Sequence, residues 1–87
     1  MRSISNGRKA NLVPLAELVG TVLDVDASTI DDSSSPTSVD GWDSLMHVSL
    51  IAAMEETYSV FFTAAEMRDA TSVGELRRLL KDKGVQV

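Results

Sequence analysis

The sequence of 87 residues contains no cysteine. Disulfide bonds, thiolate metal sites and a cysteine nucleophile are therefore excluded, and any thiol chemistry must come from outside the chain. No apolar run approaches the roughly 20 residues of a membrane span, so we expect no membrane insertion. Residues 1–11 lack the apolar centre of a secretory signal, and we expect the protein to lie in the cytoplasm.

Basic residues are scarce beyond the first eleven positions. Residues 1–11 hold three basic and no acidic residues, whereas residues 12–87 hold five basic and thirteen acidic ones, a formal net charge of −8. This acidic surface lacks the basic footprint that nucleic acid requires. We expect protein partners with basic surface patches, which such a charge attracts.

Length and pattern predict one small all-α domain. We assign residues 1–11 to a flexible N-terminal tail and residues 12–87 to a single domain. The predicted fold is a bundle of three main helices plus one short helix, with a long loop between the first two. Helical spacing predicts the first helix over residues 12–23, with Pro14 tolerated in its first turn and an apolar face formed by Leu15, Leu18, Val19 and Val22.

The last two helices are predicted from capping signals. Thr63 and Glu66 form a capping box that begins a short helix, which ends near Asp69. Ser72 and Glu75 repeat the pattern before a helix over residues 73–83. Gly84 then suits the left-handed position just after a helix.

The segment 24–43 is predicted to be a loop, because it contains six Asp, no basic residue and a run of Ser. Ile30 and Val39 are expected to anchor it to the helices. Asp24, Asp26 and Ser28 imitate the first ligands of a calcium loop, but the required glycine and final glutamate are absent. We therefore expect no metal site.

The helix predicted over residues 44–58 has two apolar faces. The first is expected to face the core and consists of His47, Leu50, Ile51, Met54 and Tyr58. The second, which we name the outer stripe, consists of Leu45, Val48 and Ala52 and continues to Glu55 and Glu56. A small domain cannot bury both faces, so we predict that the outer stripe contacts partner proteins.

Asp43, Ser44 and His47 supply the residue types of a hydrolytic triad. Ser44 and His47 lie three residues apart on one helix, and a chain with a single histidine offers little material for an oxyanion hole or a walled pocket. We therefore expect no catalytic residue, and His47 is interpreted as a helix residue at the core edge. A non-covalent helical adaptor fits the same physical pattern as a carrier does.

The segment Asp43-Ser44-Leu45, with Gly41 before it, resembles the prosthetic-group attachment motif of acyl carrier proteins and their peptidyl-carrier relatives. The resemblance extends over about residues 12–83. It includes the apolar and acidic pattern of the second helix and the turn after it, at Val48, Leu50, Ile51, Ala53, Met54, Glu55, Glu56, Tyr58, Val60 and Phe62.

The resemblance implies that a phosphopantetheinyl transferase esterifies Ser44 with 4′-phosphopantetheine from coenzyme A, Asp43 and Leu45 being the flanking residues of the motif. The thiol of the arm would then hold acyl intermediates as thioesters and carry them between acyl-loading and acyl-processing enzymes. A monomer is the simpler expectation for such a mobile shuttle. A cavity for the cargo between the second and last helices would fit the resemblance, with His47, Leu50, Met54, Phe62 and Leu76 as candidate lining residues. Ordinary core packing explains the same five residues at least as well.

The chain departs from the family pattern in informative places. Fatty-acid-type carriers commonly continue the motif with acidic residues, whereas Met46, His47 and Ser49 follow here. Trp42 is bulky where small residues are common, and it either shapes partner choice or anchors the loop. These departures favour a dedicated fatty-acid-like, polyketide or other specialised pathway, with an aminoacyl or peptidyl carrier as the alternative.

Overall fold

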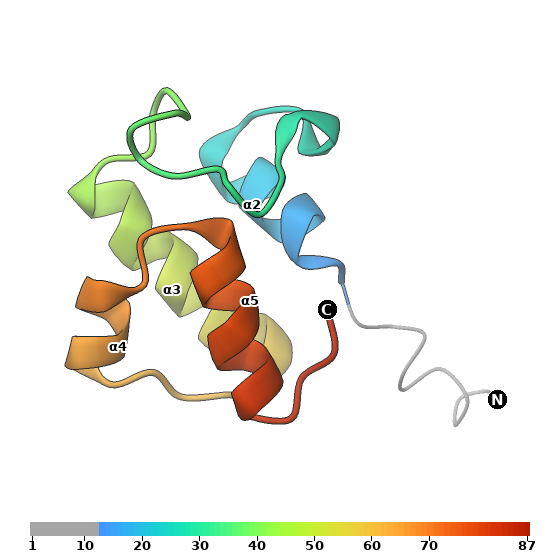
Figure 1. The fold of residues 1–87 in the computed structure, drawn as a ribbon, viewed down its shortest axis with the longest axis vertical. Coiled ribbons are helices and arrows are strands. Elements are labelled where there is room, and N and C mark those ends of the chain that lie inside the picture. Colours follow the sequence, from blue (N-terminus) through green and yellow to red (C-terminus); the bar gives the residue numbers. More distant parts are fainter. Residues whose placement is uncertain (1–12) are drawn as a thin grey trace, which may run out of the picture.

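The structure is a computed structural model that describes residues 13–87, and over this range it contains helices and no strand. The elements are α2 (Leu15–Leu23), the 3-10 helix η1 (Ala27–Thr29), α3 (Ser44–Tyr58), α4 (Ala64–Asp69) and α5 (Val73–Asp82) (Figure 1). The predicted all-α bundle is thereby confirmed, including its long loop before α3. The tail predicted over residues 1–11 lies outside the described residues.

Helix α2 begins at Leu15, three residues later than the sequence predicts. Pro14 is the N-cap, with an extended ψ of 141°, and its carbonyl accepts hydrogen bonds from the N–H groups of Glu17 and Leu18. The residue before a proline disfavours the helical conformation, so Val13 stays outside the helix. The predicted start was therefore wrong, whereas the end at Leu23 is confirmed.

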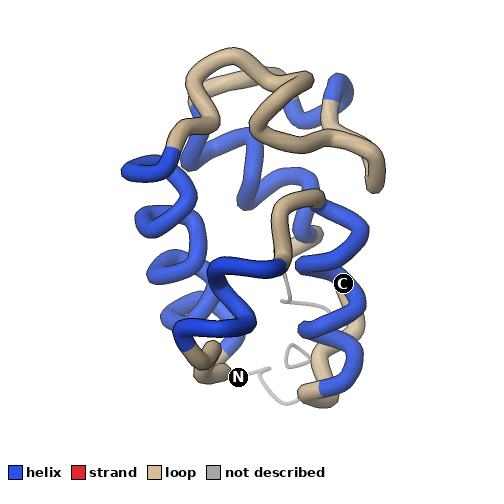
Figure 2. The backbone as a smooth tube through the Cα atoms, turned by 60° about the vertical axis from the view of Figure 1, so that its left-hand side comes forward, coloured by secondary structure: helices blue, strands red, loops and turns tan. Residues whose placement is uncertain are grey.

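The segment between α2 and α3 forms an irregular loop that crosses one end of the bundle (Figure 2). Its short helix η1 is capped by Asp26, whose side chain accepts a hydrogen bond from the N–H of Ser28. Ile30 is buried, as predicted, and Val39 packs against the core while only partly buried. Trp42 is a deeper anchor than either, with 3% of its surface exposed.

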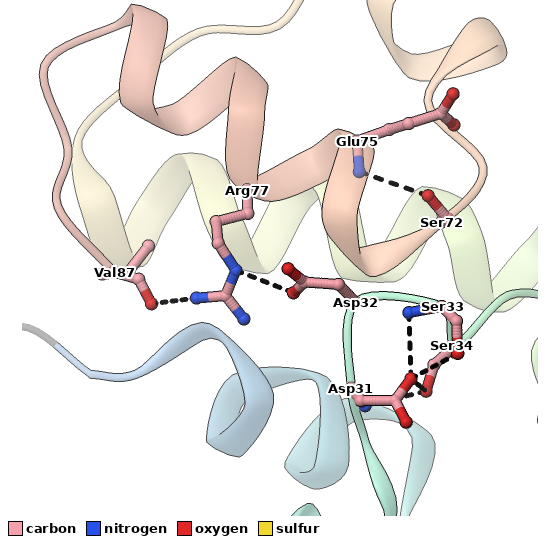
Figure 3. A network of polar contacts seen from close by, with 8 residues as sticks. All are labelled: Asp31, Asp32, Ser33, Ser34, Ser72, Glu75, Arg77 and Val87. Carbon is pink, nitrogen blue, oxygen red and sulfur yellow. Dashed lines mark hydrogen bonds and ion pairs between the residues drawn. The ribbon is translucent and has the colours of Figure 1, made fainter.

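The loop also supplies hydrogen-bond acceptors to the start of α5. The N–H of Val73 donates to the carbonyl of Ser34 at 3.0 Å, and the N–H of Gly74 donates to the carbonyl of Asp32 at 2.9 Å. The Arg77 guanidinium pairs with the Asp32 carboxylate at 2.9 Å (Figure 3). These bonds satisfy two of the backbone donors that a helix leaves free at its start.

Gly74 permits this close approach of loop and helix. A Cβ atom at this position would lie 3.0 Å from the Asp32 carbonyl oxygen. Carbon and oxygen at that distance crowd each other, and the oxygen belongs to backbone that is itself held by the Gly74 hydrogen bond. The small residue in the first turn of α5 is therefore a packing requirement.

The capping predictions hold for α4 and hold only in part for α5. Thr63 and Glu66 form the complete capping box. Ser72 accepts a hydrogen bond from the N–H of Glu75, but the Glu75 carboxylate accepts from the N–H of Thr71 and not from that of Ser72. The second box was therefore half wrong, because Glu75 reaches one residue further back along the chain.

The core lies between α2, α3 and α5. Its fully buried side chains include Leu15 of α2, Leu50 and Met54 of α3, and Leu76 and Leu80 of α5. Helix α5 ends at Asp82 with Lys83 as its C-cap, one residue before the predicted end, and Gly84 adopts the expected positive φ of 91°. Helix α4 contributes no buried residue, although Ala70 directly after it is buried.

Tyr58 joins the end of α3 to the segment before α2. Its hydroxyl donates a hydrogen bond of 2.6 Å to the carbonyl of Val13. Desolvation by burial raises the pKa of Tyr58 to about 12, against an opposing effect of the Arg77 charge. Folding therefore favours the protonated phenol, and this stabilisation is complete below the ordinary pKa of 10 and is lost as the pH rises from 10 to about 12.

We predict that the absorbance titration of this single tyrosine has its midpoint near pH 12 while the domain stays folded. Tyr58→Phe should lower the free energy of unfolding at pH 7 by about 1 kcal/mol, measured by urea titration, because one hydrogen bond is lost. The variant should also lose less stability than the wild type between pH 10 and 12. Since both proteins contain the same lysines, equal losses would contradict the assignment.

Candidate functional site

Ser44 is the first residue of α3, and its side chain is exposed. The preceding Asp43 is the N-cap, and its carboxylate accepts a hydrogen bond of 2.9 Å from the N–H of Met46. Aspartate is among the best residues for this role, so the helix start is locally encoded. The Ser44 hydroxyl is thus held at the positive end of the dipole of a 15-residue helix, next to open solvent.

Both ring nitrogens of His47 are engaged in hydrogen bonds. The indole Nε1–H of Trp42 donates to Nδ1 at 3.1 Å, and Nε2 lies 2.8 Å from the carbonyl oxygen of Met67. Since a carbonyl can only accept, Nε2 carries the proton and the ring is the neutral Nε2–H tautomer. His47 has no free nitrogen with which to take a proton from Ser44, so the triad arrangement lacks its base.

Trp42 is the site residue that sequence reasoning left undecided. Its indole is buried and stacks on the His47 ring, with 6.0 Å between the ring centroids and 26° between their planes. Loop anchoring is therefore a role that Trp42 fills. The sequence does contain a signal for the Trp42–His47 hydrogen bond. A buried indole N–H needs an acceptor, and the single histidine lies only five residues after Trp42.

A pocket of about 520 Å³ opens beside Ser44. Its walls come from the loop, the first turns of α3 and the end of α4, and consist of Pro36, Trp42, Asp43, Ser44, His47, Val48, Met67, Arg68 and Thr71. Of the five residues predicted to line a cargo cavity, only His47 belongs to this pocket. The other four, Leu50, Met54, Phe62 and Leu76, are buried in the packed core, as ordinary core packing predicts.

The outer stripe lies at the surface of α3. Leu45 is 73% exposed and Val48 is 51% exposed, and Ala52 is exposed as well. At the far end of the stripe Glu56 is exposed, whereas the Glu55 carboxylate accepts a hydrogen bond of 2.9 Å from the N–H of Phe62. Glu55 therefore also fixes the turn between α3 and α4.

Within residues 13–87, no group of three His, Cys, Asp or Glu side chains is arranged to hold a metal ion. The loop carboxylates instead bind their own segment. Hydrogen bonds from Ser28 hold the pKa of Asp26 below its ordinary value, and the bond from the backbone N–H has a larger effect than the bond from the hydroxyl. Hydrogen bonds from Ser33 lower the pKa of Asp31 in the same way, and there the bond from the hydroxyl has the larger effect. Over the same described range, no helix is long and apolar enough to cross a membrane.

Comparison with known proteins identifies the family. Residues 14–80 match the family described as "Phosphopantetheine attachment site". The solution NMR structure of the holo acyl carrier protein from Geobacter metallireducens is similar, with a TM-score of 0.72 and 32% sequence identity over 79% of each chain. No curated protein sequence matches the chain. The chain belongs to the phosphopantetheine-attachment family and is a carrier protein of the acyl carrier type.

The cofactor of this carrier is 4′-phosphopantetheine, and a carrier domain of this type is not itself catalytic. The residues around Ser44 fit such a group. The positive helix end suits a phosphate, Arg68 lies on the pocket wall, and Val48 and Met67 offer apolar surface to an extended arm. When bound, the group supplies the thiol that the cysteine-free chain lacks.

We predict that Asp43→Ala lowers the free energy of unfolding by about 1 kcal/mol, because it removes the cap on Met46. Asp43→Asn keeps an acceptor oxygen and should retain most of that stability. Urea titration of the three proteins measures the difference. Equal losses in the two variants would show that the charge of Asp43, and not its hydrogen bond, stabilises α3.

Proposed function

We propose that Ser44 is the residue to which 4′-phosphopantetheine is attached. The observation that carries the proposal is the exposed hydroxyl of Ser44 at the first position of α3, beside the pocket and inside the matched family region. Ser72 also lies at a helix start, but it is only partly exposed and its hydroxyl accepts from the N–H of Glu75. Asp43 holds Ser44 at the helix end, and Leu45 offers an exposed apolar contact beside it.

The attachment is a phosphoryl transfer in which a separate transferase supplies the catalytic groups. The Ser44 oxygen forms a bond to the phosphorus that carries pantetheine in coenzyme A, and the pyrophosphate P–O bond breaks. The nucleotide half leaves as adenosine 3′,5′-bisphosphate, and the hydroxyl proton passes to a base of the transferase. His47 is not that base, because both of its nitrogens are already engaged.

We further propose that the loaded arm carries acyl groups for a dedicated fatty-acid-like, polyketide or other specialised pathway, as a monomer in the cytoplasm. The support is the composition of α3, whose first acidic residue is Glu55, more than two turns after Ser44. The surface near Ser44 is instead apolar, at Leu45 and Val48. Loading and processing enzymes would therefore contact an apolar centre with acidic residues at its far edge.

The test of the attachment site is intact mass after incubation with coenzyme A and a promiscuous phosphopantetheinyl transferase. The wild type should gain one phosphopantetheine, and Ser44→Ala should gain none. Ser72→Ala is the matched control, because it also removes a hydroxyl at a helix start, and it should be modified fully. No gain by the wild type, with the transferase active on another carrier, would leave the non-covalent adaptor as the function.

The outer stripe generates a second prediction. Val48→Asp should lower kcat/KM for modification about tenfold, because it places a charge in the apolar centre of the contact, where single residues contribute about 1–2 kcal/mol. Glu56→Lys should lower it by a smaller factor, because Glu56 lies at the edge. Both rates are measured with varied carrier concentration.

Thr57→Asp is the control for Val48→Asp. Thr57 is exposed on the same helix but lies outside the outer stripe, and its substitution should leave the rate unchanged. Glu55 is a poor test position, because its carboxylate also holds the N–H of Phe62. If Val48→Asp is modified at the wild-type rate, the outer stripe is not part of the docking surface.

A further inference from the structure

The Trp42 indole, the His47 imidazole and the Met67 carbonyl are joined in series by two hydrogen bonds, and we name this network the Trp42–His47 relay. The Trp42 indole donates to the His47 ring at 3.1 Å, and that ring donates to the Met67 carbonyl at 2.8 Å. The indole is 3% exposed and the imidazole is half-buried, so water competes weakly for these bonds. The relay thus joins the end of the loop, the first turn of α3 and the last turn of α4.

Helix α4 has few contacts with the rest of the bundle beyond the packing of Met67 against the core. None of its residues is buried, and the polar contacts of its body with the rest of the bundle are the relay and an ion pair of 3.0 Å between Glu66 and Lys83. The Met67 carbonyl lies in the last turn of α4, where helix carbonyls lack intrahelical partners. His47 therefore acts as a cap supplied by α3, and it fixes the distance between α4 and the start of α3.

The two aromatic residues of the relay flank Ser44 in the sequence. Trp42 lies two residues before Ser44, and His47 lies three residues after it, in the first turn of α3. Because the two rings stack and share a hydrogen bond, the backbone that carries Ser44 is fixed on both sides. The same two rings form part of the pocket wall beside the Ser44 side chain.

We propose that Trp42 and His47 are positioning residues for the transfer of phosphopantetheine to Ser44. The relay holds the helix start so that the Ser44 oxygen meets the phosphorus in one orientation when the transferase is bound. Misplacing a reacting atom by about 1 Å can lower a rate about a hundredfold, so a small rotation of the helix start is enough to matter. The proposal rests on the proposed function, in which Ser44 is the attachment residue.

A positioning role and a purely structural role change different kinetic constants. If a variant only lowers the folded fraction, less of the carrier is competent, so the apparent KM rises while kcat at saturating carrier is unchanged. If a variant misplaces Ser44 within the bound complex, kcat falls while KM is kept. The outer stripe, which governs docking in the proposed function, is left intact by changes in the relay.

The first comparison uses Trp42→Phe and Tyr58→Phe. Each removes one buried hydrogen-bond donor at an end of α3, but only Trp42 lies next to Ser44. We expect Trp42→Phe to lower kcat for modification at least fivefold with KM within twofold of the wild type. Tyr58→Phe should leave kcat unchanged. Equal kcat values for the two variants would overturn the proposal.

The second comparison uses His47→Gln and His47→Leu. A glutamine can accept from the Trp42 indole through its oxygen and donate to the Met67 carbonyl through its nitrogen, whereas leucine can do neither. We expect His47→Gln to keep kcat within twofold and His47→Leu to lower it like Trp42→Phe. The fluorescence of the single tryptophan should shift in His47→Leu and stay near wild type in His47→Gln.

A kcat that is equal in the Gln and Leu variants would contradict a role for the hydrogen bonds. Urea titration identifies any variant that is not folded. If a variant of one comparison is unfolded, the other comparison still tests the positioning role, because each comparison has its own control variant. Failure of the proposed function is recognised separately, because the wild type would then gain no mass or Ser44→Ala would still gain it.

Discussion

The burial of one face of α3 is the interaction on which the rest of the structure depends. Leu50 and Met54 belong to the same core cluster as Leu15 of α2 and Leu76 of α5. A domain of this size has a small core, so these contacts supply much of the apolar area removed from water. Because one face of α3 is committed to the core, the opposite face, with Ser44 at its start, remains at the surface.

The long acidic loop packs across the end of this core because its backbone carbonyls and its carboxylates accept hydrogen bonds from other parts of the domain or from the loop itself. Two of its carbonyls accept from the first N–H groups of α5, and its carboxylates accept from neighbouring Ser residues. Trp42 then carries the chain from the loop into α3 as a buried anchor. The segment before Ser44 is therefore fixed in place although it contains little regular structure.

The site combines an exposed reactive group with a rigid support. Ser44 is exposed to solvent and to a large partner. Asp43 caps the start of α3, and a hydrogen bond joins Trp42 and His47, the residues that flank Ser44 in the sequence. Such an arrangement suits a protein that is the substrate of other enzymes. In the proposed function the carrier presents one hydroxyl in a defined orientation, while the catalytic groups and the thiol come from elsewhere.

The sequence by itself determined what depends on near neighbours: the range of α3, the capping box at Thr63 and the exposure of Leu45 and Val48 in the outer stripe. Caps and helical periodicity involve residues three or four apart, so they can be read along the chain. The tertiary structure alone decided the pairing of His47 with Met67, of Ser34 with Val73 and of Tyr58 with Val13. Those partners are twenty to forty-five residues apart, and only the packing of the helices brings a given donor to a given acceptor.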